Sequence, residues 1–409
     1  MAREKSFVIT GAEPWSDEQE RFGTSLAREL ARRGRVLYVN PPCDALSLMA
    51  ARRTARSSAQ GRVLRGAQHA LGRGDGGVWV LEPPFVAWPG GMVYSEVVFD
   101  MLNRRNNRRF AEVIGWGMAH LQMEECNLLI DNDTVGSFYL MDYLTPRMSV
   151  YCRTREGDAV RSHARVRRLD RELTLRCDMT VCDNEPDTEW ARMLNMDSFN
   201  IGRGVDIAGY LPHAEYPLPE ALRGLHGPVA GFAGRLSPQL HSAELLAGLC
   251  RLLPEVTFVF TGGAEPGFDL SFAEAGNVLM TEVEERVRPA CVNRFDLCIN
   301  PELRNRVTDR WFNPDVVRWL AMGKRTVATR TGAMSAFLGR VSLAEGVGQT
   351  AAAVLRELSS PEPDPQGDPR RELAASMSWR ECADRLCAAL EVVDEGFIEI
   401  DLEPVGRAN

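Results

Sequence analysis

Two acidic side chains follow a short apolar stretch near the middle of the chain. Glu156 and Asp158 come shortly after Met148–Cys152, which has the composition of a buried strand. A carboxylate at the carboxyl end of a strand can accept a proton as a general base. Arg153 and Arg155 would lower the pKa of Glu156 and keep it ionised. We predict Glu156 as a base and Asp158 as the second choice; a surface carboxylate paired with the arginines fits the pattern equally well.

A glycine and an arginine follow another strand-like stretch, Val229–Phe232. A glycine after a strand lets backbone N–H groups approach phosphate oxygens, and an arginine offers two parallel hydrogen bonds to them. We therefore predict that Gly234 and Arg235 bind phosphate. The alternative is a turn glycine beside a solvated arginine.

More candidates for binding an anion lie around a predicted helix that begins at Asn313 and Pro314. The N–H groups at the start of a helix can face a phosphate, although proline in the first turn is also ordinary capping. Arg310 belongs to an arginine cluster just before this helix, for which a solvated loop is the alternative to binding an anion. Arg318, on the helix, could bind a carboxylate ligand or pair with Asp315 three residues earlier.

Alternating strands and helices must position these residues. Strand-like Phe7–Thr10 and Val36–Val39 flank an amphipathic helix at roughly 17–33, a βαβ pattern typical of parallel sheets. The alternation returns at Val229, after a proline-rich linker at 208–228. We predict an α/β protein with two Rossmann-like, doubly wound domains and a last helix with a tail. Their predicted bounds are residues 1–206, 207–377 and 378–409.

Composition narrows the functional classes. The 409 residues are 44% hydrophobic and 25% charged, an ordinary globular mixture, and the net charge of −8 does not favour nucleic acid. No apolar run reaches the ~18 residues of a membrane span. The ten cysteines stand singly among apolar neighbours, which indicates reduced thiols in a cytoplasmic protein rather than a zinc site. Asp131-Asn132-Asp133 comes closest to a metal motif, but we interpret it as a turn with a helix cap and predict no metal.

Several segments, in this order and spacing, resemble the GT-B glycosyltransferases, especially bacterial polysaccharide-building members of the family-four type. Residues 26–42 are similar to their first helix and second strand, and residues 177–206 to the end of their N-domain. Residues 231–236 are similar to the opening strand and loop of their donor domain, and residues 313–329 to the donor helix and next strand. In the family, the helix after the segment similar to Ser378-Trp379 returns to the N-domain.

A second resemblance is to the xanthan glucuronosyltransferase type. The loop that carries its base is similar to Cys152–Gly157, and its acidic donor-domain residue lies in a segment similar to Met280–Val283. This points to Glu156 as the base and to Glu282 as a ligand of a sugar or ribose hydroxyl. A helix cap is the alternative for Glu282.

The resemblance implies a metal-independent hexosyltransferase. It would move a sugar from a nucleotide-sugar, with no other cofactor, to a hydroxyl of a glycan or lipid-linked acceptor in a cleft between two facing domains. The donor would be bound by residues already introduced: Gly234, Arg235, Glu282, Arg310, Asn313, Pro314 and Arg318. Gly11, Glu13 and Trp15 would line the acceptor side, with Trp15 stacking on a sugar ring; a βα turn is the alternative.

Residues 51–73 are rich in arginine and contain no acidic residue. Each basic residue at an anionic membrane can add ~1 kcal/mol. We prefer peripheral contact with the inner face of the membrane, with Leu64 and Leu71 as weak anchors. A disordered segment and a site for the phosphate of a lipid-linked acceptor are the alternatives.

Two departures from the family pattern affect the predicted function. The glutamate near the middle of the family's donor helix is matched by Arg318, and the lysine three residues earlier by Asp315. A non-catalytic GT-B protein, acting as a partner or scaffold in a glycan or natural-product pathway, is therefore the alternative. A sugar-nucleotide epimerase ranks lower, because no GxGxxG follows the first strand.

Overall fold

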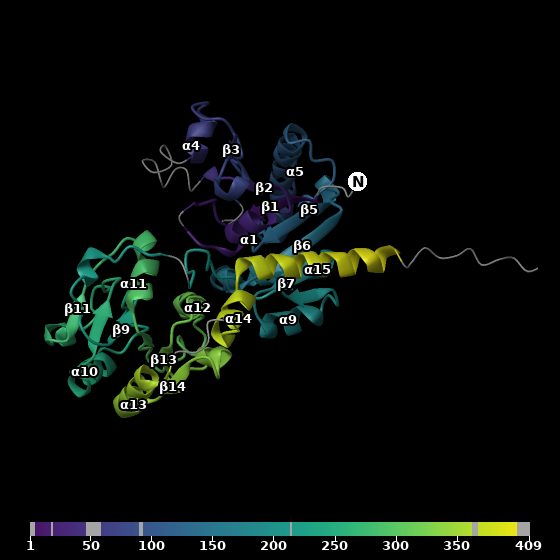
Figure 1. Cartoon of the computed structure of the whole chain (residues 1–409). Coiled ribbons are helices and arrows are strands. Elements are labelled where there is room, and N and C mark those ends of the chain that lie inside the picture. Colours follow the sequence, from purple (N-terminus) through teal and green to yellow (C-terminus); the bar gives the residue numbers. More distant parts are fainter. Residues whose placement is uncertain are drawn as a thin grey trace, which may run out of the picture. The chain divides into compact units, whose positions relative to one another are not determined.

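The chain folds into two compact units. The computed structural model describes residues 5–17, 19–45, 59–89, 93–212, 215–361 and 367–398. We call residues 1–204 together with 379–409 unit 1, and residues 205–378 unit 2. Figure 1 labels many of the elements of both.

Unit 1 is built on an eight-stranded sheet with the order β3-β4-β2-β1-β5-β6-β7-β8. All neighbouring strands are parallel except β3 and β4. The strands are β1 (Lys5–Gly11), β2 (Gly34–Val39), β3 (Leu71–Arg73), β4 (Trp79–Leu81), β5 (Asn127–Asp131), β6 (Met148–Arg153), β7 (Met179–Cys182) and β8 (Ser198–Asn200).

Helices cover both faces of this sheet, because successive strand residues point to opposite sides. Phe7 and Ile9 belong to a core cluster with α1 (Phe22–Leu30) and α15 (Trp379–Ile398). Val8, between them, belongs to a cluster with α5 (Glu96–His120) and α8 (Ala164–Arg176) on the other face. The other α-helices in the described part of unit 1 are α4 (Ala59–Leu64), α6 (Leu140–Leu144), α7 (Asp158–Arg161) and α9 (Glu185–Arg192).

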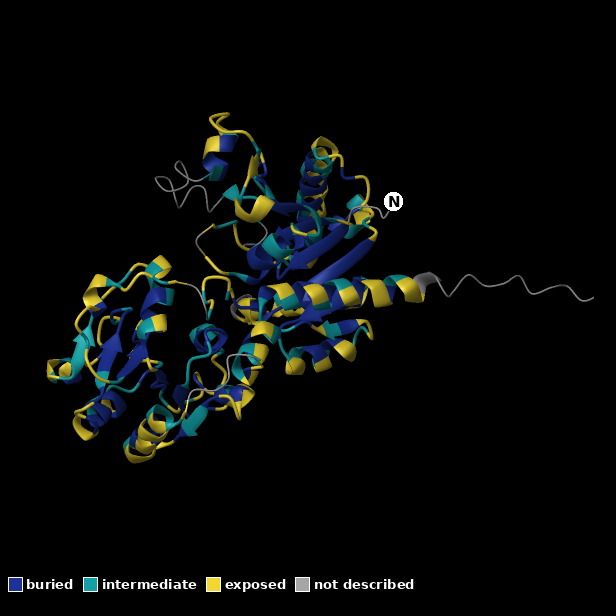
Figure 2. Cartoon of the chain, viewed as in Figure 1, coloured by how far each residue is buried: buried dark blue, intermediate teal, exposed yellow. Residues whose placement is uncertain are grey.

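The last helix, α15, packs on the sheet of unit 1, as Figures 1 and 2 show. The rings of Trp379 and Phe22 meet edge to face at 5.7 Å, and Trp379 Nε1 donates to Glu20 Oε1 at 2.7 Å. The inward side of the helix is buried and the outward side is exposed. The helix therefore completes one face of the unit 1 core.

Unit 2 has a six-stranded, fully parallel sheet with the order β11-β10-β9-β12-β13-β14. Its strands are β9 (Val229–Phe232), β10 (Thr257–Phe260), β11 (Val278–Met280), β12 (Leu297–Asn300), β13 (Thr326–Thr329) and β14 (Ser342–Ala344). Its helices are α10 (Ala243–Leu252), α11 (Arg288–Arg294), α12 (Pro314–Ala321), α13 (Gly346–Ser359) and α14 (Pro369–Ser376). The predicted fold class, α/β with two Rossmann-like domains, is confirmed.

Local differences from the prediction have local causes. The first helix begins at Phe22 rather than near 17, and Asp17 accepts a hydrogen bond from Trp15 Nε1. Of the arginine-rich stretch, 51–58 lies outside the described residues, while the rest contains α4 and β3. Leu71 packs against the core, so it is no outward anchor. Contact with a membrane stays a prediction.

Candidate functional site

Glu156 lies at the carboxyl edge of the unit 1 sheet, in a 3-10 turn directly after β6. Both of its carboxylate oxygens accept from the backbone N–H of Phe22, each at 3.3 Å. Arg203 Nη2 lies 3.7 Å from Glu156 Oε1, and the Glu156 side chain is 31% exposed. The predicted base thus sits against the first turn of α1, with one guanidinium nearby.

The electrostatics of Glu156 differ from the prediction. Burial raises the pKa of Glu156, and the lowering contributions come from Arg203, the Phe22 N–H and Arg21. Arg153 instead binds Asp170 at 3.2 Å and also Asp187. The expectation that Arg153 and Arg155 lower the pKa of Glu156 is therefore wrong. A raised pKa brings a carboxylate closer to neutral pH, where a general base is most effective.

Asp131 is a second carboxylate at the same helix end, and the sequence analysis did not link it to Glu156. It ends β5, next to β6, and is 8% exposed. Burial, followed by the charge of Glu156, raises the pKa of Asp131 to about 8, although the Gly23 N–H acts in the opposite direction. Arg21, the residue at the N-cap of α1, makes no side-chain capping bond. The carboxylates of Glu156 and Asp131 accept from the N–H groups of Phe22 and Gly23 and so take the part of a capping side chain.

Asp133 forms a turn, as expected for this segment. Its carboxylate accepts from Gly136 N at 2.8 Å and from Ser137 Oγ at 2.7 Å. No group of three or more His, Cys, Asp or Glu side chains among the described residues could hold a metal ion. The predicted metal independence stays a prediction.

Asp158 has a different environment from Glu156. Its carboxylate is 61% exposed and pairs with Arg161 at 2.6 Å. Arg161 is buried and also donates to Asn132 Oδ1 at 2.9 Å. Asp158 thus matches the alternative of an arginine-paired surface carboxylate, and Glu156 is the stronger candidate for a base.

The predicted acceptor residues form a tightly held loop after β1. A Cβ on Gly11 would lie 2.1 Å from Tyr38 Oη, so a side chain there would displace the Tyr38 ring. Tyr38 Oη donates to the Glu13 carbonyl at 2.8 Å, and Trp15 N donates to Asn40 Oδ1 at 2.7 Å. The Arg28 guanidinium carbon lies 4.8 Å from the centre of the Trp15 ring, which limits the ring's room to stack on a sugar.

In unit 2, two glycine-bearing loops pack backbone to backbone at the carboxyl edge of the sheet. A Cβ on Gly262, after β10, would lie 2.2 Å from the Gly234 carbonyl oxygen. Leu236 N donates to Gly263 O at 3.0 Å. Arg235 is exposed beside Gly234, and its Nη2 donates to Ala264 O at 3.4 Å. The Gly262-Gly263 pair was not predicted, although it follows an apolar strand as Gly234 does.

Glu282 faces these glycines. It pairs with Gly262 in an isolated bridge, and a Cβ on Gly263 would lie 2.1 Å from Glu282 Oε1. The following 3-10 turn has Glu284 at its N-cap, so the helix-cap alternative for Glu282 is wrong. Glu282 is exposed at the same edge as Gly234.

Asn313 caps α12, with its Oδ1 accepting from Asp315 N at 3.0 Å, and Pro314 opens the first turn. The Asn313 side chain is also buried, and its Nδ2 donates to Asn300 Oδ1 and Glu302 Oε1, both at 3.3 Å. The capping bond and this buried network account for Asn313, and the first helical turn accounts for Pro314, without any ligand. Any contact with a phosphate would come from backbone N–H groups of α12.

Arg318 and Asp315 form an ion pair at 2.8 Å, with side chains 13% and 19% exposed. This is the intrahelical alternative of the sequence analysis. Asp315 Oδ2 lies only 3.0 Å from where a Cβ of Gly234 would be. A carboxylate therefore stands next to the predicted phosphate loop. Arg310 is exposed in the loop before α12.

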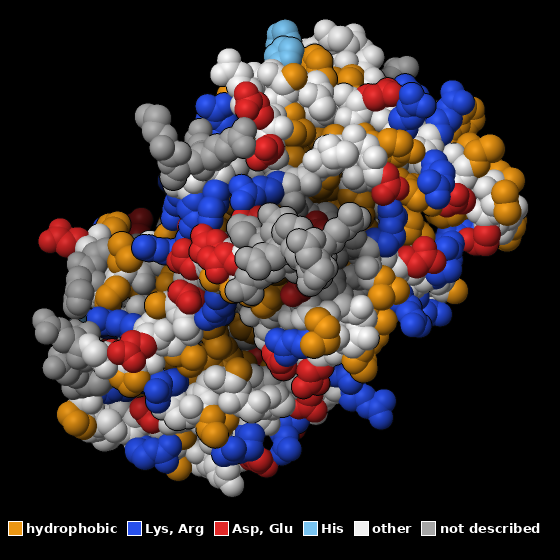
Figure 3. Space-filling model, turned by 90° about the vertical axis from the view of Figure 1, so that its right-hand side faces the viewer, with side chains coloured by type: hydrophobic (Ala, Val, Ile, Leu, Met, Phe, Trp, Pro, Cys, Tyr) orange, Lys and Arg blue, Asp and Glu red, His pale blue; other side chains and the backbone are white. Residues whose placement is uncertain are grey.

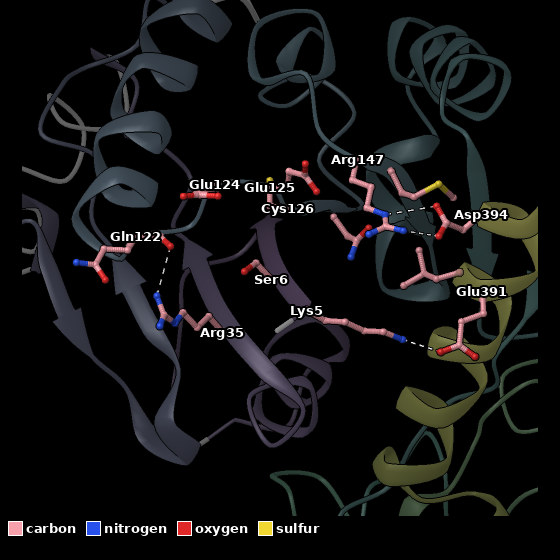
Figure 4. A pocket seen from close by; sticks show the side chains of 13 residues that line it. Lys5, Ser6, Arg35, Gln122, Glu124, Glu125, Cys126, Arg147, Glu391 and Asp394 are labelled. Carbon is pink, nitrogen blue, oxygen red and sulfur yellow. Dashed lines mark hydrogen bonds and ion pairs between the residues drawn. The ribbon is translucent and has the colours of Figure 1, made fainter. Parts of the chain in front are cut away.

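A separate cavity of about 360 Å³ opens at the opposite, amino end of the unit 1 strands. Figure 4 shows Lys5 pointing toward Glu391 and Arg147 toward Asp394, which are ion pairs. On the face in Figure 3, too, basic and acidic side chains are intermixed. Ligands of open parallel sheets bind at the carboxyl ends, so this cavity is not part of the predicted site.

No helix among the described residues is long and apolar enough to cross a membrane.

Structural comparison places the chain among known folds. Sucrose-phosphate synthase from Thermosynechococcus elongatus superposes with a TM-score of 0.56 and 12% identity, over 96% of this chain and 100% of that one. A trehalose-6-phosphate enzyme from Escherichia coli bound with UDP-2-fluoro glucose gives 0.53 and 12%, over 97% and 98%. This chain has the GT-B fold.

A third GT-B structure is similar over comparable lengths. The trehalose-phosphate synthase of Burkholderia xenovorans in complex with glucose-6-phosphate gives a TM-score of 0.52 and 10% identity, over 95% of this chain and 100% of that one. No protein-family model and no curated protein matches the sequence. That the two units face one another across a cleft stays a prediction.

Proposed function

We propose that this GT-B chain is a glycosyltransferase that moves a sugar from a nucleotide-sugar to a hydroxyl acceptor, without a metal ion. The observation that carries the proposal is the likeness, over almost the whole chain, to GT-B synthases, one of which is bound with a UDP-sugar analogue. The acceptor would be a glycan, a lipid-linked sugar or another hydroxyl compound.

Unit 2 would bind the donor. The close approach of Gly234 and Gly262 leaves backbone at the sheet edge without side chains, which suits a diphosphate. The exposed Arg235 would neutralise negative charge on the leaving phosphate. Arg310 and the backbone N–H groups in the first turn of α12 would stabilise the same charge. Glu282 would accept a hydrogen bond from a sugar or ribose hydroxyl.

Unit 1 would activate the acceptor. The acceptor oxygen would attack the anomeric carbon as the bond to the diphosphate oxygen breaks, and its proton would pass to Glu156. The burial of Glu156, which raises its pKa, supports this role. Gly11, Glu13 and Trp15 would shape the surface around it, and attack assisted by a base at Glu156 favours inversion.

The second candidate is a non-catalytic GT-B protein that acts as a partner or scaffold. The observation in its favour is Asp315, whose carboxylate lies beside Gly234. A carboxylate there repels a diphosphate unless Arg318, its partner at 2.8 Å, balances the charge. The two candidates differ in whether unit 2 binds a nucleotide.

Nucleotide binding separates the candidates. Thermal unfolding is followed with UDP, GDP, ADP, dTDP and CMP, because a ligand at 100 times its Kd adds about 2.7 kcal/mol to the stability of the folded state. At least one nucleotide should raise the melting temperature, and Arg235→Ala should remove that rise. Arg251→Ala, at another exposed arginine of unit 2, is the control. No stabilisation by any of the five would favour the scaffold.

The role of Glu156 is tested with the nucleotide-sugar that binds. Glu156→Gln should retain nucleotide binding and lose turnover by 10²-fold or more, the usual loss when a general base is removed. Asp158→Asn is the matched control and should retain turnover. Equal activity of Glu156→Gln and the wild-type protein would remove Glu156 as the base.

A further inference from the structure

Another cavity of unit 1, with a volume of about 470 Å³, lies at the carboxyl end of its sheet. The loops that follow β2, β4 and β5 enclose it, together with the first half of α5. It lies at the end of the sheet where parallel α/β folds bind ligands. None of the predicted site residues lines it.

The wall of this cavity is mostly apolar. Phe99, Phe110 and Val135 line it, and the two phenylalanines are almost completely buried. Trp88 also lines it, yet is 53% exposed. Asn106 fixes the Trp88 backbone on both sides, because Asn106 Oδ1 accepts from Trp88 N at 3.0 Å and Asn106 Nδ2 donates to Trp88 O at 2.9 Å. The backbone of Trp88 is therefore fixed at the cavity, while its large aromatic side chain stays partly exposed.

One buried polar group in the wall lacks a partner. Asn103 lines the cavity and is 4% exposed. Its Oδ1 accepts from Asn107 Nδ2 at 3.2 Å, but its Nδ2 has no hydrogen-bond partner in the described part of the chain. Buried donors in folded proteins are nearly always satisfied, so a bound oxygen atom is a fitting partner for this amide.

The charge of the cavity disfavours an anion. Asp44 and Asp133 line it, and no Lys, Arg or His is among the described residues that do so. Phosphate groups are usually bound by arginine or lysine, which this wall does not supply. The loop after β5 that supplies Asp133 to the wall begins two residues after Asp131, which accepts from the first turn of α1 as Glu156 does.

We propose that this cavity binds the apolar body of an uncharged, hydroxyl-bearing acceptor, with Trp88 stacking on it and Asn103 donating a hydrogen bond to one of its oxygens. This inference rests on the proposed glycosyl transfer. It assigns an acceptor class other than a sugar phosphate, the ligand in the Burkholderia xenovorans structure.

The test uses two probes with the same aromatic body, 2-naphthol and 2-naphthyl phosphate. Binding to the full chain is measured by isothermal titration calorimetry. 2-Naphthol should bind saturably and at least tenfold more tightly than its phosphate. Trp88→Ala should weaken 2-naphthol binding about tenfold, since a buried aromatic pair contributes up to about that factor.

Two further variants, a control and a cavity-filling substitution, show whether binding takes place in this cavity. Trp116→Ala removes another partly exposed tryptophan of unit 1, one that does not line the cavity, and should leave binding unchanged. Val135→Phe fills the cavity and should weaken binding as Trp88→Ala does. The inference is overturned if 2-naphthol does not bind, if Trp88→Ala and Trp116→Ala behave alike, or if the phosphate binds more tightly.

The outcome is independent of the nucleotide titration. Binding of 2-naphthol at Trp88 without any nucleotide binding would leave an apolar ligand site and overturn glycosyl transfer. Nucleotide binding without 2-naphthol binding would leave the transferase and overturn this acceptor class.

Discussion

Two carboxylates on neighbouring strands share the N-terminus of α1. Asp131 ends β5, and Glu156 follows β6, which pairs with β5 in parallel register. Both accept from N–H groups of the first turn of α1, which favours negative charge. Burial and their mutual repulsion act in the opposite direction. As a result, protonation of this pair is coupled, and one proton is held up to mildly alkaline pH.

This coupling predicts how stability depends on pH. Asp131 has a pKa of about 8 in the folded chain and about 3.9 when unfolded, so the folded state binds more protons between these values. Stability should therefore fall as pH rises from about 4 to about 8 because of this residue. Asp131→Asn removes the effect. Relative to the wild-type protein, this variant should gain stability on the order of a few kcal/mol between pH 5 and pH 8.5.

Urea unfolding at both pH values measures this difference. Asp158→Asn, which removes an exposed carboxylate paired with Arg161, serves as the control and should change stability equally at both. A parallel pH dependence of Asp131→Asn and the wild-type protein would mean that Asp131 is ionised throughout.

The sequence predicted where Glu156 lies but not its electrostatics. Its place after a buried strand could be inferred, because apolar runs predict strands and polar residues follow them. The partners could not, since side chains along a strand alternate between the two faces of the sheet. Arg153 therefore points toward Asp170 in α8, and Arg203, remote in sequence, lies near Glu156 instead. Asn103 could not be assigned either, as its cavity needs three loops that are distant in the chain.

At the scale of elements, the two glycine loops of unit 2 support a prediction about nucleotide binding. The Cβ of Gly262→Ala would lie 2.2 Å from a backbone oxygen, which cannot rotate away as a side chain can. The loops must separate, which should cost about 1–3 kcal/mol of stability and abolish the nucleotide-dependent rise in melting temperature.

Gly276→Ala is the matched control in the same unit, because a Cβ there would meet nothing within 4 Å. It should leave both stability and nucleotide binding near the wild-type values. Normal nucleotide binding by Gly262→Ala would show that the contact between the loops does not shape the site.

The strands were easier to predict than the helices. The apolar runs Met179–Cys182, Val229–Phe232 and Thr257–Phe260 predict strands, and β7, β9 and β10 have these bounds, because buried parallel strands read as short continuous apolar runs. The register of Val166, Leu169 and Leu173 predicts one helix at 160–176, but the structure has two helices there, α7 and α8, separated at 162–163. Its apolar spacing suits either arrangement, and tertiary packing decides between them. Edge elements such as β3 and β14 are three residues long and give too weak a pattern.

At the scale of the whole molecule, unit 1 is discontinuous in sequence. Its sheet comes from residues before 205, but α15 completes one face of its core. A Cβ on Gly204, in the segment after β8, would lie 2.2 Å from the Trp379 ring. The backbone at Gly204 is therefore in close contact with the first residue of α15. The N-terminal segment alone therefore lacks part of its core, whereas unit 2 is continuous.

Removing residues 379–409 should therefore destabilise unit 1 and leave unit 2 folded. The deletion uncovers the side chains that pack against α15, among them Phe22, and each large buried apolar group contributes about 1.5–3 kcal/mol. Calorimetry of residues 1–378 should show one transition at the wild-type temperature for unit 2 and a lowered or missing transition for unit 1. Residues 205–378, expressed separately, should reproduce the first transition. An unchanged melting profile of residues 1–378 would mean that α15 only lies on a core that is already complete.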